Sequence, residues 1–223
     1  MNIDPAWLAP TYFLDYQTPS IQDFVRQAVG DAQTPRDKAV RLFYAVRDRI
    51  RYDAYRFRVE REWYRASHTL AEGAAYCVPK AVLYAACLRS QDIPARPGFA
   101  DVRNHLSTER LIKLMGTDVF SWHGYVSLLL DGRWLKATPV FNIEMCERFH
   151  VLPLEFDGTE DSLMQPYDAR DQRHMEYVNF RGEFDDLPFD QLAGEMHRDY
   201  PHLVAAALGD KLGDFAHDAI HEG

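Results

Sequence analysis

The sequence contains few cysteines and no long apolar run. Its three cysteines form neither a C-x-x-C pair nor a regular pairing with histidine, which argues against a zinc site and against a disulfide framework. No stretch approaches the roughly eighteen consecutive apolar residues of a membrane-spanning helix. The N-terminal stretch MNIDPAWLAP lacks the basic and apolar regions of a signal peptide. We therefore expect a cytoplasmic protein in a reducing compartment that does not bind membranes.

Positive charge is scarce as well. The chain of 223 residues has 25 Lys and Arg against 34 Asp and Glu, a net charge of −9, which disfavours a nucleic-acid partner. Internal repeats and low-complexity tracts are absent. The acidic stretch DGTEDS lacks the spaced ligands and closing Glu of an EF-hand. These absences lead us to expect no cofactor and no metal.

The remaining composition, 47% hydrophobic and 26% charged, is that of an ordinary globular protein. We expect a single domain over residues 1–223, with its core at about 35–145 and a C-terminal extension over 146–223 packing on that core. The clearest helix signal near the N-terminus is TPRDKAVRLFYAVRDR, in which Thr34 can cap and Pro35 occupies the first turn. A second amphipathic helix is expected over residues 107–115, capped by Ser107 and ending at Gly116.

The stretch AEGAAYCVPKAVLYAACLRS, residues 71–90, places a cysteine where a loop becomes an apolar helix. Pro79 is tolerated only in the first turn, so Cys77 falls at the helix N-terminus, where free N–H groups and the macrodipole favour an anion. Such a position can lower a thiol pKa from about 8.5 to roughly 3.5–7.5. The alternative is a buried cysteine that acts as a small hydrophobe, and we assign that role to Cys87 and Cys146.

A hairpin is the clearest strand signal. Two alternating runs, FSWHGYVSLLL and RWLKATPVFN, flank the dipeptide Asp131-Gly132, which suits a type I′ turn. We expect strands over 120–130 and 133–138, in a register that sets Tyr125 opposite Thr138. Because side chains alternate along a strand, one face is expected to carry His123, Tyr125, Thr138, Val140 and Asn142.

Three segments, taken in order, resemble the core of the transglutaminase-like superfamily: AAYCVPKAVLYAACLRSQDIPARPGFADV, SWHGYVSLLLDGRW and WLKATP. The resemblance spans about residues 35–142. It implies an α+β, papain-like fold in which a helix bearing Cys packs on an antiparallel sheet bearing His, with helical N- and C-terminal additions. It also implies that Cys77 is the nucleophile and His123 the base of acyl chemistry, with backbone N–H groups at the helix start stabilising the oxyanion.

The sequence departs from the family at the third catalytic position. The Asp of the family pattern falls on Thr138, which can hydrogen-bond but supplies no negative charge. Asn142 shares the expected face with His123 and can orient it in the Cys-His-Asn manner of papain-like proteases. We therefore expect Asn142, more than Thr138, to hold the imidazole, with Asp101 or Asp157 as loop alternatives.

Two functions follow from this pattern. The first is thiol-dependent acyl chemistry, by hydrolysis or transfer, on a peptide, a protein or a small amide. The second is a binding module with weakened or lost catalysis, favoured by the neutral Thr138. A metal hydrolase lacks a ligand motif such as H-E-x-x-H. Tyr76 and Trp122 are expected to line the cleft, with a place in the core as the alternative for these aromatics, and the sequence carries no signal of oligomeric state.

Overall fold

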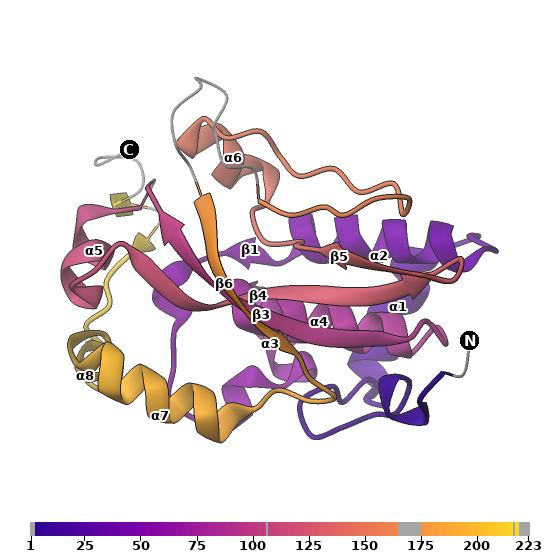
Figure 1. The fold of residues 1–223 in the computed structure, drawn as a ribbon, viewed down its shortest axis with the longest axis horizontal. Helices are drawn as coiled ribbons and strands as arrows, with labels where there is room; N and C mark the ends of the chain where they lie inside the picture. Colours follow the sequence, from indigo (N-terminus) through magenta and orange to yellow (C-terminus); the bar gives the residue numbers. More distant parts are fainter. Residues whose placement is uncertain (1–2, 106, 165–174, 216, 219–223) are drawn as a thin grey trace.

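In the computed structural model, a four-stranded sheet lies against a layer of helices, and the structure describes residues 3–105, 107–164, 175–215 and 217–218 (Figure 1). All neighbouring strands run antiparallel, in the order β5-β4-β3-β6. The strands are β3 (Ala95–Asn104), β4 (Val119–Leu130), β5 (Arg133–Ala137) and β6 (Met175–Glu183). This arrangement confirms the expected α+β fold, with a cysteine-bearing helix packed on an antiparallel sheet.

Prolines mark the start of both long N-terminal helices. The α1 helix (Pro19–Val29) and the α2 helix (Pro35–Arg49) each begin at proline, whose fixed φ suits a first turn. The Thr34 hydroxyl accepts a hydrogen bond from the Asp37 amide, as expected of a capping residue. The shorter elements before the cysteine are η1 (Pro5–Trp7), β1 (Arg51–Tyr52), η2 (Ala54–Arg56), η3 (Arg61–Tyr64), α3 (Ala66–Glu72) and β2 (Ala74–Ala75).

The α4 helix (Cys77–Arg89) is buried on all sides, because it lies between the sheet and the helices α2 and α3. Every residue from Val78 to Arg89 is buried, including Lys80. Its ammonium group donates to the carbonyls of Arg47 and Ile50, at 2.9 and 2.5 Å, where α2 ends. These bonds fix the start of α4 against the end of α2.

The β4–β5 hairpin has the register that the Asp131-Gly132 turn predicts. Leu130 pairs with Arg133, and Val126 pairs with Ala137. The ladder ends at Ala137, one residue earlier than expected. There the next amide, that of Thr138, donates to the Ser162 carbonyl at 2.9 Å instead of pairing with β4.

Further helices among the described residues lie around one end of the sheet. The α5 helix (Glu109–Met115) is capped by Thr108, one residue later than expected, and ends at Gly116. The others are α6 (Ile143–Phe149), α7 (Phe189–Asp199) and α8 (Pro201–Leu208). In Figure 1, α8 lies beside α5, and α7 packs on α8 below the sheet. Among the described residues, every helix is too short or too polar to cross a bilayer.

Candidate active site

Cys77 is the first residue of α4 and is partly exposed. The residue before it, Tyr76, makes no side-chain capping bond, so backbone N–H groups at this helix start are open to the sulfur. The N–H groups of Val78 and Cys77 at the helix start, together with that of Gly124 on β4, act to lower the pKa of the Cys77 thiol. Burial nevertheless raises the pKa of the Cys77 thiol to about 11, because the loss of hydration outweighs these donors. The expectation of a lowered thiol pKa is therefore wrong for this structure.

The other two cysteines lie in the core. Cys87 is fully buried and Cys146 is 2% exposed. Burial raises both thiol pKa values, that of Cys146 to about 11. Of the three cysteines, Cys77 alone is partly exposed.

His123 lies on β4 at the point where that strand touches the start of α4. The neighbouring glycine, Gly124, explains this close approach. A Cβ atom at that position would lie 2.8 Å from the Cys77 carbonyl oxygen and 3.0 Å from the Ala81 Cβ. The absence of a side chain at Gly124 thus lets the two elements that carry Cys77 and His123 meet.

Cys77 and His123 line the same cavity, whose volume is about 70 Å³. Its walls are mostly aromatic and aliphatic, and within the part of the chain that the structure describes no Asp, Glu, Lys or Arg lines it. The lining residues are Tyr52, Ala54, Phe57, Tyr76, Cys77, Asn104, Leu111, Met115, Phe120, Ser121, His123, Phe141, Met175, Met196, Tyr200 and Leu203. The structure therefore brings the two expected catalytic residues, and Tyr76, to one apolar cavity.

Four tyrosines surround the sulfur at electrostatic range. Burial raises the pKa of each hydroxyl, and negative charge on Cys77 raises it further; they are Tyr52, Tyr64, Tyr76 and Tyr177. The Tyr76 hydroxyl donates to that of Tyr64 at 2.9 Å. Tyr52, Tyr64 and Tyr177 were not predicted as site residues, because no local spacing in the sequence relates them to the cysteine.

Tyr177 connects the third family position to the histidine. Its ring centre lies 6.0 Å from that of His123, with the ring planes at 74°. The Thr138 side chain is fully buried, and its hydroxyl makes no regular hydrogen bond to a described residue. The Thr138 hydroxyl interacts with the Tyr177 hydroxyl and acts to lower the pKa of Tyr177. Burial has the larger effect and raises the pKa of Tyr177 to about 12. Thr138 thus faces a tyrosine that stands beside the histidine.

Asn142 does not orient His123 here, contrary to expectation. Its side-chain oxygen accepts from the Tyr52 amide at 2.9 Å, and its nitrogen donates to Glu144 at 2.6 Å. The physical reason is the early end of β5. After Ala137 the chain leaves the ladder, so that Asn142 becomes the residue preceding α6 and ties that helix to β1.

The two loop carboxylates considered as alternatives have other partners. Asp157 is exposed and accepts from the amide and the hydroxyl of Thr159, at 2.8 and 2.7 Å. Asp101 lies on β3, where it accepts from Arg181 at 2.5 Å and from the Trp122 amide at 3.4 Å. It therefore supports the backbone that precedes His123.

That backbone forms a bulge. Ala100 pairs with His123 and Val102 with Phe120, so Asp101 alone stands opposite two residues, Ser121 and Trp122. Trp122 has φ of +64°, a left-handed conformation that is rare for a bulky residue. Bulges of this kind re-aim the following side chain. The bulge therefore sets the direction in which His123 projects from β4.

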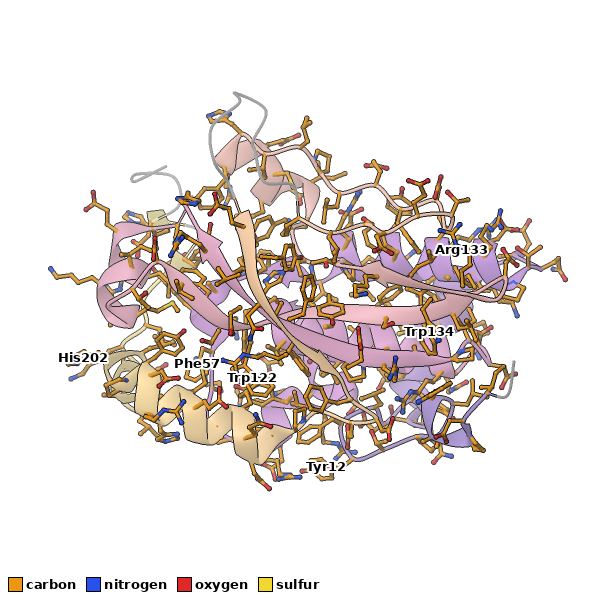
Figure 2. The ribbon with its side chains drawn as sticks, viewed as in Figure 1. Tyr12, Phe57, Trp122, Arg133, Trp134 and His202 are labelled. Atoms are coloured by element: carbon orange, nitrogen blue, oxygen red, sulfur yellow. The ribbon has the colours of Figure 1, made fainter. Side chains whose placement is uncertain are left out.

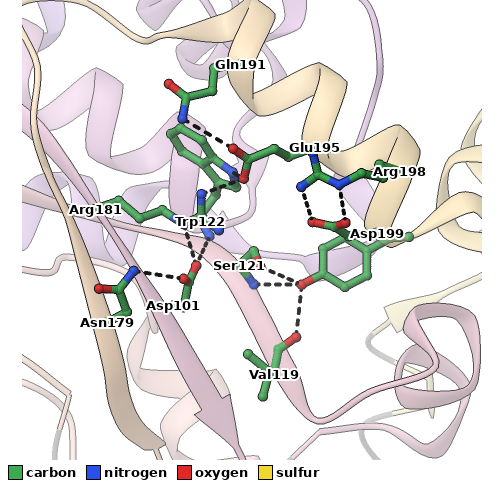
Figure 3. Close-up of polar contacts among 11 residues, drawn as sticks. Asp101, Val119, Ser121, Trp122, Asn179, Arg181, Gln191, Glu195, Arg198 and Asp199 are labelled. Atoms are coloured by element: carbon green, nitrogen blue, oxygen red, sulfur yellow. Dashed lines mark hydrogen bonds and ion pairs between the residues drawn. The ribbon is translucent and has the colours of Figure 1, made fainter.

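Side chains far away in the sequence hold the bulge (Figure 3). The Tyr200 hydroxyl accepts from the Ser121 amide at 2.9 Å. The Trp122 indole donates to Glu195 of α7 at 2.9 Å, and the Arg181 guanidinium lies 4.7 Å from its ring centre. Arg181 also pairs with Glu195, at 2.5 Å. Glu195 of α7 and Tyr200 before α8 thus accept hydrogen bonds from the bulge, and Arg181 of β6 donates to Glu195 and packs on the Trp122 ring.

Trp122 itself does not line the cavity, contrary to expectation. It is fully buried, and strand alternation directs its side chain away from the face of His123. Figure 2 shows Trp122 next to α7, far from Trp134 at the other end of the hairpin. Its ring packs against Phe99 and Phe184 instead, at 5.3 and 6.4 Å between centres.

Within residues 3–105, 107–164, 175–215 and 217–218, no group of three or more His, Cys, Asp or Glu is placed to hold a metal ion.

Comparisons with known proteins give a family match and a similar solved structure. Residues 22–139 match the family model of the transglutaminase-like superfamily. A search among curated proteins found no match. Among solved structures, the chain is similar to one described as a putative cysteine protease from Cytophaga hutchinsonii, at 20% identity and a TM-score of 0.45. That alignment covers 60% of this chain and 40% of the other.

Proposed function

The chain belongs to the transglutaminase-like superfamily, and from that premise we propose that it performs cysteine-dependent acyl chemistry, hydrolysis or transfer, on a peptide, a protein or a small amide. Cys77 is the nucleophile and His123 is the base. The observation that carries the proposal is that both residues line one cavity, with Cys77 at the start of a helix.

The raised pKa of Cys77 determines how the first step proceeds. At neutral pH a thiol with a pKa of about 11 is protonated, so its proton leaves during the attack and not before it. His123 accepts this proton while the sulfur bonds to the carbonyl carbon. The negative charge develops on the carbonyl oxygen as the sulfur–carbon bond forms, and the Cys77 amide is available to stabilise this oxyanion.

The remaining steps return the enzyme to its starting state. His123 gives its proton to the leaving amine as the carbon–nitrogen bond breaks, and an acyl group remains on Cys77. Water or an amine then attacks this thioester, the sulfur–carbon bond breaks, and the displaced sulfur recovers a proton through His123. Hydrolysis and transfer differ only in which nucleophile enters at this point.

The binding module is the second candidate, and one observation favours it. Thr138 is neutral, buried and directed to Tyr177, so the third family position supplies no negative charge to an imidazolium. A binding module would hold the same ligands without turning them over. Dependence of turnover on Cys77 therefore distinguishes the enzyme from the binding module.

Turnover of p-nitrophenyl acetate, a small activated acyl donor, tests the proposal. We expect Cys77→Ala to reduce the rate to that of the buffer, and His123→Phe to reduce it by about a hundredfold or more. Cys146→Ala is the matched control, because it removes a buried thiol outside the cavity, and it should keep the wild-type rate. Equal rates for the wild type and Cys77→Ala would refute the enzyme and favour the binding module.

A further inference from the structure

Part of the cavity beside Cys77 is built by segments that lie outside the family match. Met175, Met196, Tyr200 and Leu203 follow residue 139, the last residue matched. They come from β6, α7 and α8 and from the turn between these two helices. The part of the cavity wall that these four residues form is therefore a property of this chain that family membership does not imply.

The polar atoms on the wall are largely engaged by the protein itself. The Tyr200 hydroxyl bonds to the amide and the hydroxyl of Ser121 and to the Val119 carbonyl, at 2.9, 2.9 and 3.0 Å. The Tyr76 hydroxyl donates to that of Tyr64. A ligand that enters here meets mainly methyl, methylene and ring surfaces, together with Cys77, His123 and Asn104.

A charged ligand group would find no opposite charge on this wall. Among the described residues that line the cavity, none is Asp, Glu, Lys or Arg, and burial of an unpaired carboxylate is strongly unfavourable. The volume of about 70 Å³ is less than half of the roughly 150 Å³ of a cavity that admits benzene. The space therefore suits a short aliphatic group better than an aromatic ring.

We propose that this cavity binds an uncharged, short aliphatic portion of the acyl donor, adjacent to the carbonyl that Cys77 attacks. The inference rests on the proposed function, because it names the substrate class for the same cysteine. Donors with a carboxylate or an ammonium in this portion are rejected. The methionines at positions 115, 175 and 196 adapt the wall to branched and unbranched chains, since the thioether side chain is flexible.

The test uses alkylation of Cys77, which requires no turnover. The probes are N-propylmaleimide and 3-maleimidopropionate, whose side chains have three carbons each and differ in the charged carboxylate. Peptide mass spectrometry gives the rate at which each reagent labels Cys77, and the propyl rate is divided by the carboxylate rate. Dividing this ratio by the same ratio for glutathione removes the difference in intrinsic reactivity between the two reagents. We expect wild-type Cys77 to prefer the propyl reagent at least about tenfold beyond glutathione, since tenfold corresponds to only about 1.4 kcal/mol.

Met115 allows a matched pair of variants on α5. It lines the cavity and is half-buried, whereas Ile112 on the same helix is half-buried and does not line it. Met115→Lys should reduce the preference about tenfold by pairing with the carboxylate reagent, and Ile112→Lys should leave it unchanged. Thermal unfolding checks that both variants fold; if Met115→Lys does not, the wild-type ratio alone decides.

A wild-type ratio equal to that of glutathione would overturn the inference, as would an unchanged ratio in folded Met115→Lys. Neither result bears on the proposed function, which depends on turnover. Conversely, turnover that persists in Cys77→Ala would refute the function and leave the labelling preference intact. The two failures are therefore distinguishable.

Discussion

At the scale of single residues, two opposing effects set the pKa of the Cys77 thiol. Three N–H groups stabilise its anion, and removal from water destabilises it more, so the pKa rises to about 11. A cysteine of this kind is unreactive until a base accepts its proton. The local sequence around Cys77 predicted its place at the helix start but not its pKa, because burial depends on tyrosines that lie elsewhere in the chain.

This balance predicts the pH dependence of alkylation. Because the thiolate is the reactive form, the rate of Cys77 labelling by iodoacetamide should rise about tenfold per pH unit from 7 to 9 and level off only near the pKa of about 11. Peptide mass spectrometry of Cys77 measures it. A rate that stays flat below pH 7 would contradict this account and would indicate a thiolate–imidazolium pair at rest.

Gly124 gives a second prediction at this scale. A methyl group there would press on the Cys77 carbonyl, a backbone atom that cannot move aside cheaply. Gly124→Ala should therefore lower the free energy of unfolding by about 1–3 kcal/mol and slow acyl turnover. Urea denaturation and p-nitrophenyl acetate turnover measure both effects.

Gly194 is the control for this substitution. It lies within α7, and an added Cβ meets nothing within 4 Å. Gly194→Ala should therefore leave turnover unchanged and stabilise the protein by roughly 0.5–1 kcal/mol, through helix propensity. If both alanine variants behaved alike, the close approach at Gly124 would be of no consequence.

At the scale of elements, the β4 bulge determines where His123 projects. The hairpin register followed from its two-residue turn, because that turn fixes the pairing of the strands it joins. The bulge was not predictable from the sequence, because its supports, Asp101, Arg181, Glu195 and Tyr200, are scattered along the chain. For the same reason Asn142 was misplaced: a contact between Thr138 and Ser162 ends β5, and no local pattern signals it.

Arg181 tests the role of the bulge supports. Arg181→Met removes the contacts to Asp101, Glu195 and the Trp122 ring. We expect kcat for acyl turnover to fall about ten- to a hundredfold, since small misplacements have effects of this size. KM should stay within about twofold, because Arg181 does not line the cavity.

The control is Arg198 at the end of α7, which pairs with Asp199 and whose side chain is 67% exposed. Arg198→Met should keep both kinetic constants. A parallel change of kcat and KM in Arg181→Met, or equal kcat for both variants, would show that the bulge does not position the base.

At the scale of the whole molecule, one buried arginine links segments from both ends of the chain. Arg89, at the end of α4, is 1% exposed. It donates to the carbonyls of Ala9, Ala95 and Asp185, at 2.8, 2.8 and 2.9 Å. Burial lowers its pKa to about 10. Since buried hydrophobic side chains from Phe13 to Phe215 form one cluster, we expect the N-terminal segment, the core and the C-terminal extension to unfold together.

Arg89→Met should lower the free energy of unfolding by about 3 kcal/mol or more, because three charge-assisted bonds are lost and buried carbonyls stay unpaired. Urea denaturation, followed by both circular dichroism and tryptophan fluorescence, should give one coincident transition for the wild type and for the variant. Arg26→Met, at a side chain 73% exposed, should change little. Two separate transitions in the wild type would refute the single-domain expectation.

The central claim is that an acyl group passes through Cys77, and detection of the acyl-enzyme tests it most directly. The protein is mixed with p-nitrophenyl butyrate, quenched in acid, digested and analysed by mass spectrometry. The account predicts one butyryl group per chain, on the peptide that carries Cys77, formed more slowly in His123→Phe and absent in Cys77→Ala. A Cys77 peptide that remains unmodified while p-nitrophenol is released, or butyryl groups that appear equally on Cys87 and Cys146, would contradict it.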